Sequence, residues 1–95
     1  MIVSMIQFRL ELPPLESIKD KRRIVSSLKG RLARRFHLSV AEVDLQDSFQ
    51  YAQLGAALVS NSKSFGESVM HKVLAFVENS REGVLQDAEI HSESF

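Results

Sequence analysis

The sequence has no cysteine and no tryptophan, and among its 95 residues there are only two prolines, four glycines and one tyrosine. The lack of cysteine excludes disulfide bonds, zinc–thiolate sites and thiol catalysis. It also suits a reducing compartment such as the cytoplasm. No apolar run approaches the roughly 20 residues that span a bilayer. The apolar N-terminus meets Arg9 and Glu11 and lacks the pattern of a signal peptide. We therefore expect a cytoplasmic protein without a membrane partner.

The overall composition has no excess of either charge, with 12 basic and 12 acidic residues. A hydrophobic content of 44% and a charged content of 25% are typical of a soluble globular protein. A chain of this length has room for one hydrophobic core only. We therefore expect residues 1–95 to form a single domain.

The spacing of apolar residues predicts six elements. Apolar and polar residues alternate over residues 2–12, which predicts a half-buried strand. From residue 18 to about 36 the spacing changes to three and four, which predicts an amphipathic helix capped by Ser17. Alternation returns over residues 38–46 and 51–60, on either side of a turn at 47–50, and this pattern predicts a hairpin. A second helix from the capping-box residues Ser64 and Glu67, and a strand over residues 84–92, complete the order.

Strand, helix, strand, strand, helix, strand is an α+β order. With right-handed crossovers it predicts a ferredoxin-like βαββαβ sandwich, in which both helices cover one face of a four-stranded antiparallel sheet in the order 4-1-3-2. The other face of the sheet is then open. In the second strand the alternation sets Ala41 and Val43 against Glu42 and Asp44, and we expect the two acids on the open face.

Motifs that would indicate catalysis or a bound cofactor are missing. There is no GxSxG elbow, no glycine-rich phosphate loop and no dinucleotide fingerprint. The three histidines show no metal-ligand spacing. Acylphosphatases share the expected fold but carry a glycine-rich loop after the first strand, where this chain has the rigid, acidic residues 13–17. We therefore expect no enzymatic activity, no cofactor and no metal site.

Positive charge is concentrated in the first predicted helix. Residues 17–36 hold eight of the twelve cations and a single acid. These cations are Lys19, Lys21, Arg22, Arg23, Lys29, Arg31, Arg34 and Arg35. Such a surface predicts docking of a polyanion, in the first place RNA, and the five arginines suit phosphate and base contacts. Lys21 and Arg35 fall inside the apolar stripe near the two helix ends and are expected to reach outward past its edges. The alternative is a solvated helix exterior, partly neutralised by Glu16, Asp20, Glu67 and Glu78.

The open sheet face suggests a second hypothesis, a protein-interaction or self-assembling module. We expect no aromatic residue on this face within the two central strands and mostly acids on its edge strands, so it is unsuited to stack RNA bases. The small residues of the third strand form a shallow strip that suits a dimer interface. The candidate interface residues are Arg9, Glu42, Asp44, Phe49, Tyr51, Gly55 and Ala57. A third hypothesis, a small-ligand regulatory module, requires a pocket near the strand–helix junctions.

Four segments carry a resemblance to a known family. They are "SIKDKRR" at 17–23, "RRFHLSVAEVD" at 34–44, "QD" at 46–47 and "AQLGAALVSN" at 52–61. Together they resemble the bacterial YlxP-like family, a domain of unknown function. The resemblance implies a ferredoxin-like fold and carries over no catalytic residue. Genes of relatives often lie beside genes for transcription-elongation, translation-initiation and ribosome-maturation factors, which implies an RNA or ribosome partner by association.

The same segments suggest a link between the first helix and the second strand. Because these elements are consecutive, Lys21 or Arg22 is expected to reach a carboxylate of Glu42 or Asp44. These charges then either form an internal ion pair or stay free for a partner, and the sequence leaves both open.

Overall fold

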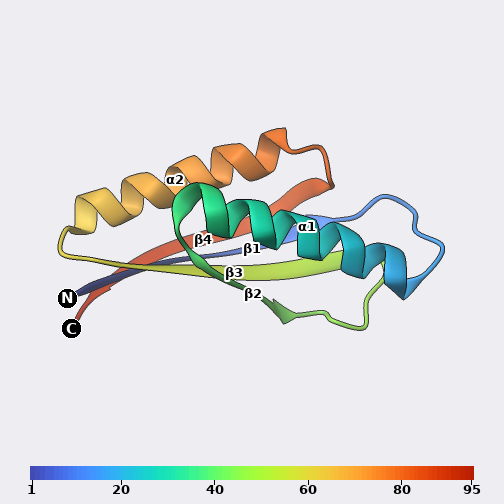
Figure 1. Ribbon diagram of the computed structural model, residues 1–95, viewed down its shortest axis with the longest axis horizontal. Helices are drawn as coiled ribbons and strands as arrows, with labels where there is room; N and C mark the ends of the chain where they lie inside the picture. The colour runs from blue at the N-terminus through green and yellow to red at the C-terminus, as the bar shows by residue number, and fades with distance from the viewer.

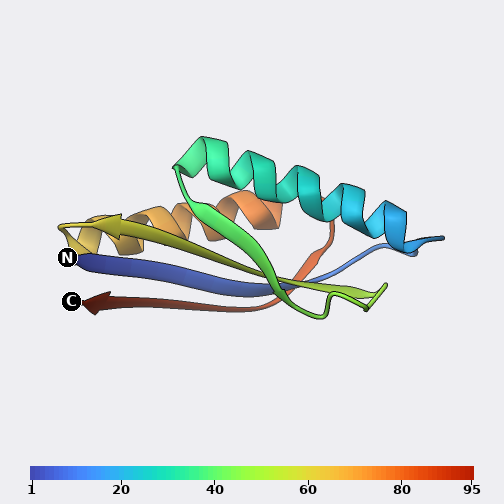
Figure 2. The ribbon, with the colours of Figure 1, turned by 60° about the horizontal axis from the view of Figure 1, so that its bottom comes forward.

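The computed structural model describes all of residues 1–95 and contains the six elements in the expected order. They are β1 (Ile2–Glu11), α1 (Ile18–Phe36), β2 (Ser39–Asp44), β3 (Tyr51–Ser60), α2 (Lys63–Asn79) and β4 (Val84–Ser94). The strands form one antiparallel sheet in the order β2-β3-β1-β4, which confirms the predicted order. Both helices cover one face and leave the other open, so the ferredoxin-like fold is confirmed (Figures 1 and 2).

Serine caps determine where both helices begin. The backbone of Ser17 is extended, and its hydroxyl accepts a hydrogen bond from the amide of Asp20 at 3.2 Å, as the sequence predicts. In α2 the cap is Ser62, whose hydroxyl accepts from the amide of Phe65 at 3.2 Å. The prediction of Ser64 as the cap was wrong. Because Ser62 already has the extended backbone of a cap, the helix starts earlier and Ser64 lies in its first turn.

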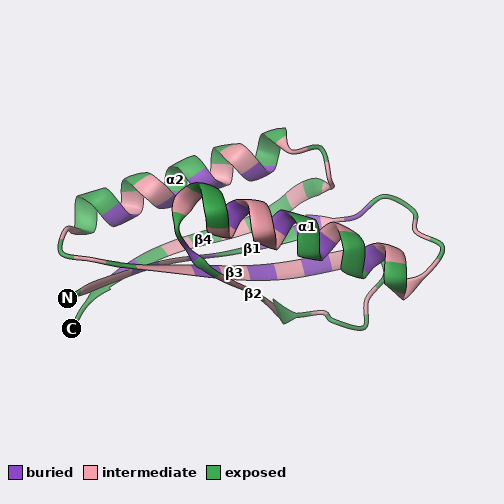
Figure 3. Ribbon diagram, in the orientation of Figure 1, coloured by how far each residue is buried: buried purple, intermediate pink, exposed green.

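The hydrophobic core lies between the helices and the sheet. The buried residues of both helices are on the sides that face the sheet (Figure 3). In β1 every second residue from Ser4 to Leu12 is buried, as expected for a strand with one covered face. The largest fully buried apolar side chains are Ile6, Phe8, Leu10, Leu28, Leu32, Leu54, Met70, Val73 and Val77.

In β2 the side chain of Glu42 lies on the opposite face of the sheet from the predicted one. Glu42 pairs with Leu54, which is fully buried, so the side chain of Glu42 faces the helix layer and not the open face. The prediction placed Glu42 outward because a carboxylate normally avoids the covered face of a sheet. Here Lys21 of α1 lies within 3.2 Å of it and neutralises its charge.

A bulge in β2 then returns the chain to the expected orientation. The register with β3 shifts between Glu42 and Asp44, and Asp44 pairs with Gln53 on the open face. Val43 lies over Gly55, where an added Cβ would come within 3.0 Å of the valine side chain. Asp44 is therefore on the predicted side, whereas Val43 faces outward and is 45% exposed.

The two ends of the chain lie side by side (Figure 1). Strand β4 extends to Ser94, and the Phe95 amide donates to the Met1 carbonyl at 2.7 Å. The protein is elongated, with extents of 44 × 23 × 22 Å. Neither helix has the length and apolar character needed to cross a membrane.

Candidate nucleic-acid interface

Helix α1 carries its cations on an element that is only partly flanked by α2. The two helices run antiparallel, and the N-terminal half of α1 projects beyond the end of α2, above the β2–β3 hairpin (Figure 1). One side of α1 packs on the sheet through Val25, Leu28 and Leu32. The rest of its circumference faces α2 or solvent. Two of the eight cations form an ion pair with an acid of the same chain, and the other six do not.

Lys21 is the first neutralised cation, and it is 1% exposed. Its ammonium group donates to the carbonyl oxygens of Leu45 and Ser48, each at 2.6 Å, and lies 3.2 Å from a carboxylate oxygen of Glu42. Of the two alternatives that the sequence left open for these charges, the internal ion pair is the one that forms, between Lys21 and Glu42. The expectation that Lys21 reaches outward and contacts a polyanion was wrong, because its charge is used to fix the hairpin loop.

Arg31 is the second neutralised cation. It forms an ion pair with Glu82, in the loop that follows α2. Its side chain is 36% exposed, and its guanidinium carbon lies 5.9 Å from the ring centroid of Phe76. Arg31 therefore joins α1 to α2 and keeps only part of its charge available to a ligand.

The other six cations have no acidic partner. None of them lies within 4.0 Å of a carboxylate, because the only salt bridges in the protein are those of Lys21, Arg31 and His91. Five are exposed and one, Lys29, is half-buried. We refer to these six residues as the basic face of α1. They are Lys19, Arg22, Arg23, Lys29, Arg34 and Arg35.

An aromatic pair lies beside the C-terminal end of this basic face. The rings of Phe36 and Phe76 meet edge to face, with centroids 5.7 Å apart. The guanidinium carbon of Arg35 lies 5.7 Å from the first ring and 5.4 Å from the second. The sequence pattern carries no signal that these two phenylalanines would lie under an arginine. Both are only partly buried.

The open sheet face contains most of the second set of predicted residues. Arg9, Tyr51, Gly55 and Ala57 lie on it, in register across β1 and β3. Arg9 lies 5.8 Å above the Tyr51 ring, so this face does carry an aromatic residue, contrary to the expectation. Tyr51 is the first residue of β3, at the end of the exposed row of that strand.

Acids border this face along β4. Asp87, Glu89 and Glu93 are all exposed, and the first of them is directly opposite Arg9. This charge distribution disfavours phosphate at Arg9 and Tyr51.

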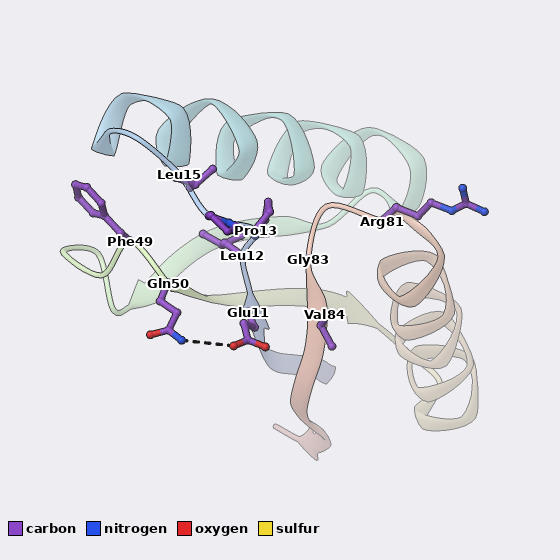
Figure 4. A pocket seen from close by; sticks show the side chains of 10 residues that line it. Glu11, Leu12, Pro13, Leu15, Phe49, Gln50, Arg81, Gly83 and Val84 are labelled. Carbon is purple, nitrogen blue, oxygen red and sulfur yellow. Dashed lines mark hydrogen bonds between the residues drawn. The ribbon is translucent and has the colours of Figure 1, made fainter.

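Phe49 lies elsewhere, at a groove where three loops meet at one end of the sheet. The groove has a volume of about 780 Å³ and is lined largely by apolar residues, among them Leu12, Pro14 and Val84 (Figure 4). Its main polar group is the Glu11 carboxylate, which accepts hydrogen bonds from the side-chain amides of Gln50 at 3.5 Å and Gln86 at 3.1 Å. Arg81 points away from the groove, so no set of polar groups converges there.

Together these features define a ferredoxin-like domain with a basic helix layer and an acid-bordered open sheet face. The sequence profile of a family described as "Protein of unknown function (DUF503)" matches residues 3–90. The chain belongs to this family. It is 33% identical over 63 residues to "Uncharacterized protein YlxP" of Bacillus subtilis (strain 168). The aligned segment covers 66% of this chain and 68% of the relative. The predicted family resemblance is thereby confirmed.

Solved structures with the same fold have unrelated sequences. The designed ferredoxin-fold protein LFR1 1 superposes with a TM-score of 0.57 at 9% identity, over 98% of this chain and 83% of its own. The cofactor-independent oxygenase SnoaB of Streptomyces nogalater superposes with a TM-score of 0.52 at 10% identity, over 99% and 92%. At such identities the similarity extends to the fold alone.

Proposed function

We propose that this protein is a non-enzymatic RNA-binding protein that docks on RNA, free or ribosomal, through the basic face of α1. The observation that carries the proposal is that these six cations have no acid within 4.0 Å. In a molecule with equal numbers of acidic and basic residues, six unpaired cations on one helix create a local positive surface that attracts anionic partners. RNA provides the repeated phosphates that such a row of charges would neutralise.

The length of the row supports an extended ligand. From Lys19 to Arg34 the helix rises about 22 Å at 1.5 Å per residue. Arg23 lies between them on the same side, at helical spacing. A single small anion would contact only part of this row, whereas a polynucleotide can follow it. The arginines add planar groups that bind phosphate through two nitrogens at once.

Charge reversal on α1 tests this function. The triple variant Arg22→Glu, Arg23→Glu, Arg34→Glu is expected to abolish binding of a fluorescein-labelled single-stranded RNA, measured by fluorescence anisotropy. For the wild type, the slope of log affinity against log salt is expected near −0.7 per phosphate contacted. The matched control is Arg9→Glu, Lys63→Glu, Arg81→Glu, which changes the same charge at exposed sites outside α1. Binding that survives the first variant, or is lost equally in the control, would contradict the proposal.

A second candidate function is self-assembly through the open sheet face. The observation that favours it is the exposure of Val59 (62%) and Val43 (45%) beside the small residues Gly55 and Ala57. Apolar side chains on a flat face are typical of interfaces between copies. Light scattering of the nucleic-acid-free protein tests it. A mass above one subunit that returns to one subunit in Val59→Glu would support it, and a monomer at all concentrations would contradict it.

A further inference from the structure

We infer that the corner between Phe36 and Phe76 is a binding site for a single nucleotide of an RNA strand, with the phosphate on the arginines of α1 and the base on the aromatic pair. This inference rests on the proposed RNA-binding function and deepens it. It distinguishes one position, where a base is held, from the rest of the basic face, which contacts phosphates only.

Two adjacent hollows meet at this corner. The first has a volume of about 390 Å³ and is lined by Arg31, Arg34, Arg35 and Phe76. The second has a volume of about 360 Å³ and shares Arg35 and Phe76 with the first. Its other lining residues are Phe36, Lys72, Ala75 and Asn79. The two hollows differ in chemistry, because one is lined mainly by guanidinium groups and the other has an aromatic floor with polar groups at its rim.

The first hollow is suited to a phosphate group. Three of its four lining side chains are arginines, and Arg34 and Arg35 have no acidic partner. Glu82 neutralises Arg31 alone. Two unpaired guanidinium groups can donate several hydrogen bonds to the oxygens of one phosphate.

The second hollow is suited to a base. The Phe36 and Phe76 rings line it, and the guanidinium carbon of Arg35 lies 5.7 and 5.4 Å from their centroids. Unpaired bases stack on aromatic rings and on the planes of arginine guanidinium groups. The side-chain NH₂ of Asn79 donates to the Ala75 carbonyl at 2.9 Å, and its side-chain oxygen is an acceptor that this bond does not use. Lys72 adds a donor at the rim.

The other arginine–aromatic contact of the molecule lacks this environment. Arg9 lies over Tyr51 on the open face, but Asp87 is directly opposite Arg9 in the sheet. A phosphate there would approach a carboxylate. On the helix layer, the acid at the corner is Glu82, whose carboxylate is already paired with Arg31, while Arg34 and Arg35 have no acid within 4.0 Å. The nucleotide site is therefore placed at the Phe36–Phe76 corner.

The test compares two probes of equal length, a labelled oligouridylate and an abasic oligoribonucleotide. Wild-type protein is expected to bind the oligouridylate about 5- to 100-fold more tightly, since stacking one base contributes that much to affinity. Phe76→Leu is expected to remove most of this preference and to leave affinity for the abasic strand unchanged. The matched control is Phe65→Leu, at an exposed phenylalanine in the first turn of α2.

A second pair of variants keeps the test independent of any effect of Phe76 on folding. Lys72 and Lys63 are both exposed residues of α2, and only Lys72 lines the hollow. Lys72→Gln is expected to weaken oligouridylate binding, and Lys63→Gln to leave it unchanged. Equal affinity of the two strands for the wild type would overturn the nucleotide site while the RNA-binding function stood.

The failure of the function itself gives a different result. If neither strand binds, adenosine 5′-monophosphate is titrated into the wild-type protein, and the NMR signals of the Phe76 ring and the Asn79 side-chain amide are followed. Shifts of these signals would retain the nucleotide site and overturn only the RNA function. No shift, together with no binding of either strand, would overturn both.

Discussion

At the scale of single residues, Lys21 shows how one buried charge organises a loop distant in sequence. Its ammonium group replaces its lost water with two carbonyl oxygens of the β2–β3 loop at 2.6 Å and the Glu42 carboxylate at 3.2 Å. Removing an ammonium group from water costs several kcal/mol, and only such a complete set of partners offsets that cost. Leu45, one of the two carbonyl residues, has a positive φ of 61°, which is uncommon for a non-glycine residue.

The substitution Lys21→Met is expected to lower the free energy of unfolding by about 3 kcal/mol, because it leaves a carboxylate and two carbonyl groups without their donor. The value is at the lower end for a broken buried pair because Glu42 keeps 20% of its side-chain surface in water. Urea denaturation followed by circular dichroism measures the change. The control is Lys19→Met on the exposed side of the same helix, expected within about 0.5 kcal/mol of wild type. Equal effects of the two substitutions would contradict the structural role of Lys21.

The sequence could predict that Lys21 or Arg22 meets a carboxylate, because α1 and β2 are consecutive. It could not predict which side of β2 would face the core. In "LSVAEVD" both the even-numbered and the odd-numbered positions contain apolar residues, so the alternation does not show which set faces the core. The partner of one polar residue determines the orientation instead. Glu42 points inward because Lys21, 21 residues earlier in the preceding helix, is there to pair with it. Such a pairing between distant positions leaves no periodic trace in the sequence.

At the scale of elements, the glycines of the two helices differ in the space around them. In α2, Gly66 packs directly against β1, and an added Cβ would come within 2.7 Å of the Ser4 Cβ. Ser4 is itself buried and bonded to the Ser92 hydroxyl at 2.8 Å, so it has little room to move. In α1, the nearest atom to an added Cβ at Gly30 is the end of the flexible Arg34 side chain, at 3.1 Å.

The same substitution is therefore expected to have opposite effects in the two helices. Gly66→Ala overpacks the contact between α2 and β1 and should destabilise the protein by about 1–3 kcal/mol. Gly30→Ala should stabilise it by about 0.5–1 kcal/mol, since alanine is the better helix former and Arg34 can swing aside. Thermal unfolding of the two variants beside the wild type measures both effects. Stabilisation by both substitutions would show that helix propensity alone governs both positions, and destabilisation by both would show that Arg34 does not swing aside.

The candidate site was predictable element by element but not in its details. The concentration of cations in residues 17–36 and the period of their apolar neighbours place a basic surface on one helix, and the structure has that helix at Ile18–Phe36. The nucleotide corner depends instead on how α1 meets α2. Phe36 is the last residue of α1 and Phe76 lies near the end of α2. The packing of the two helices brings the ring centroids to 5.7 Å from each other.

At the scale of the whole molecule, zero net charge hides a separation of charge between two sides. The unpaired cations lie on the helix layer, whereas Asp87, Glu89 and Glu93 lie on the sheet along β4. The sheet and the buried core stand between the two sides. At physiological salt, exposed charges further apart than about 8 Å are largely screened from each other. The two sides should therefore act on their ligands independently.

This independence can be measured with one variant on each side. Arg9→Glu combined with Val59→Glu changes the open face, and it is expected to leave RNA affinity within about twofold of wild type, because distant sites without shared partners are close to additive. Conversely, Arg22→Glu, Arg23→Glu, Arg34→Glu should leave the light-scattering mass of the nucleic-acid-free protein unchanged. Purification at low and high salt, read by the 260/280 nm absorbance ratio, gives the same comparison for RNA bound in cells. A tenfold loss of RNA affinity in the open-face variant would mean that RNA contacts both sides or binds only an assembled form, and the basic face of α1 would then be one part of a larger interface.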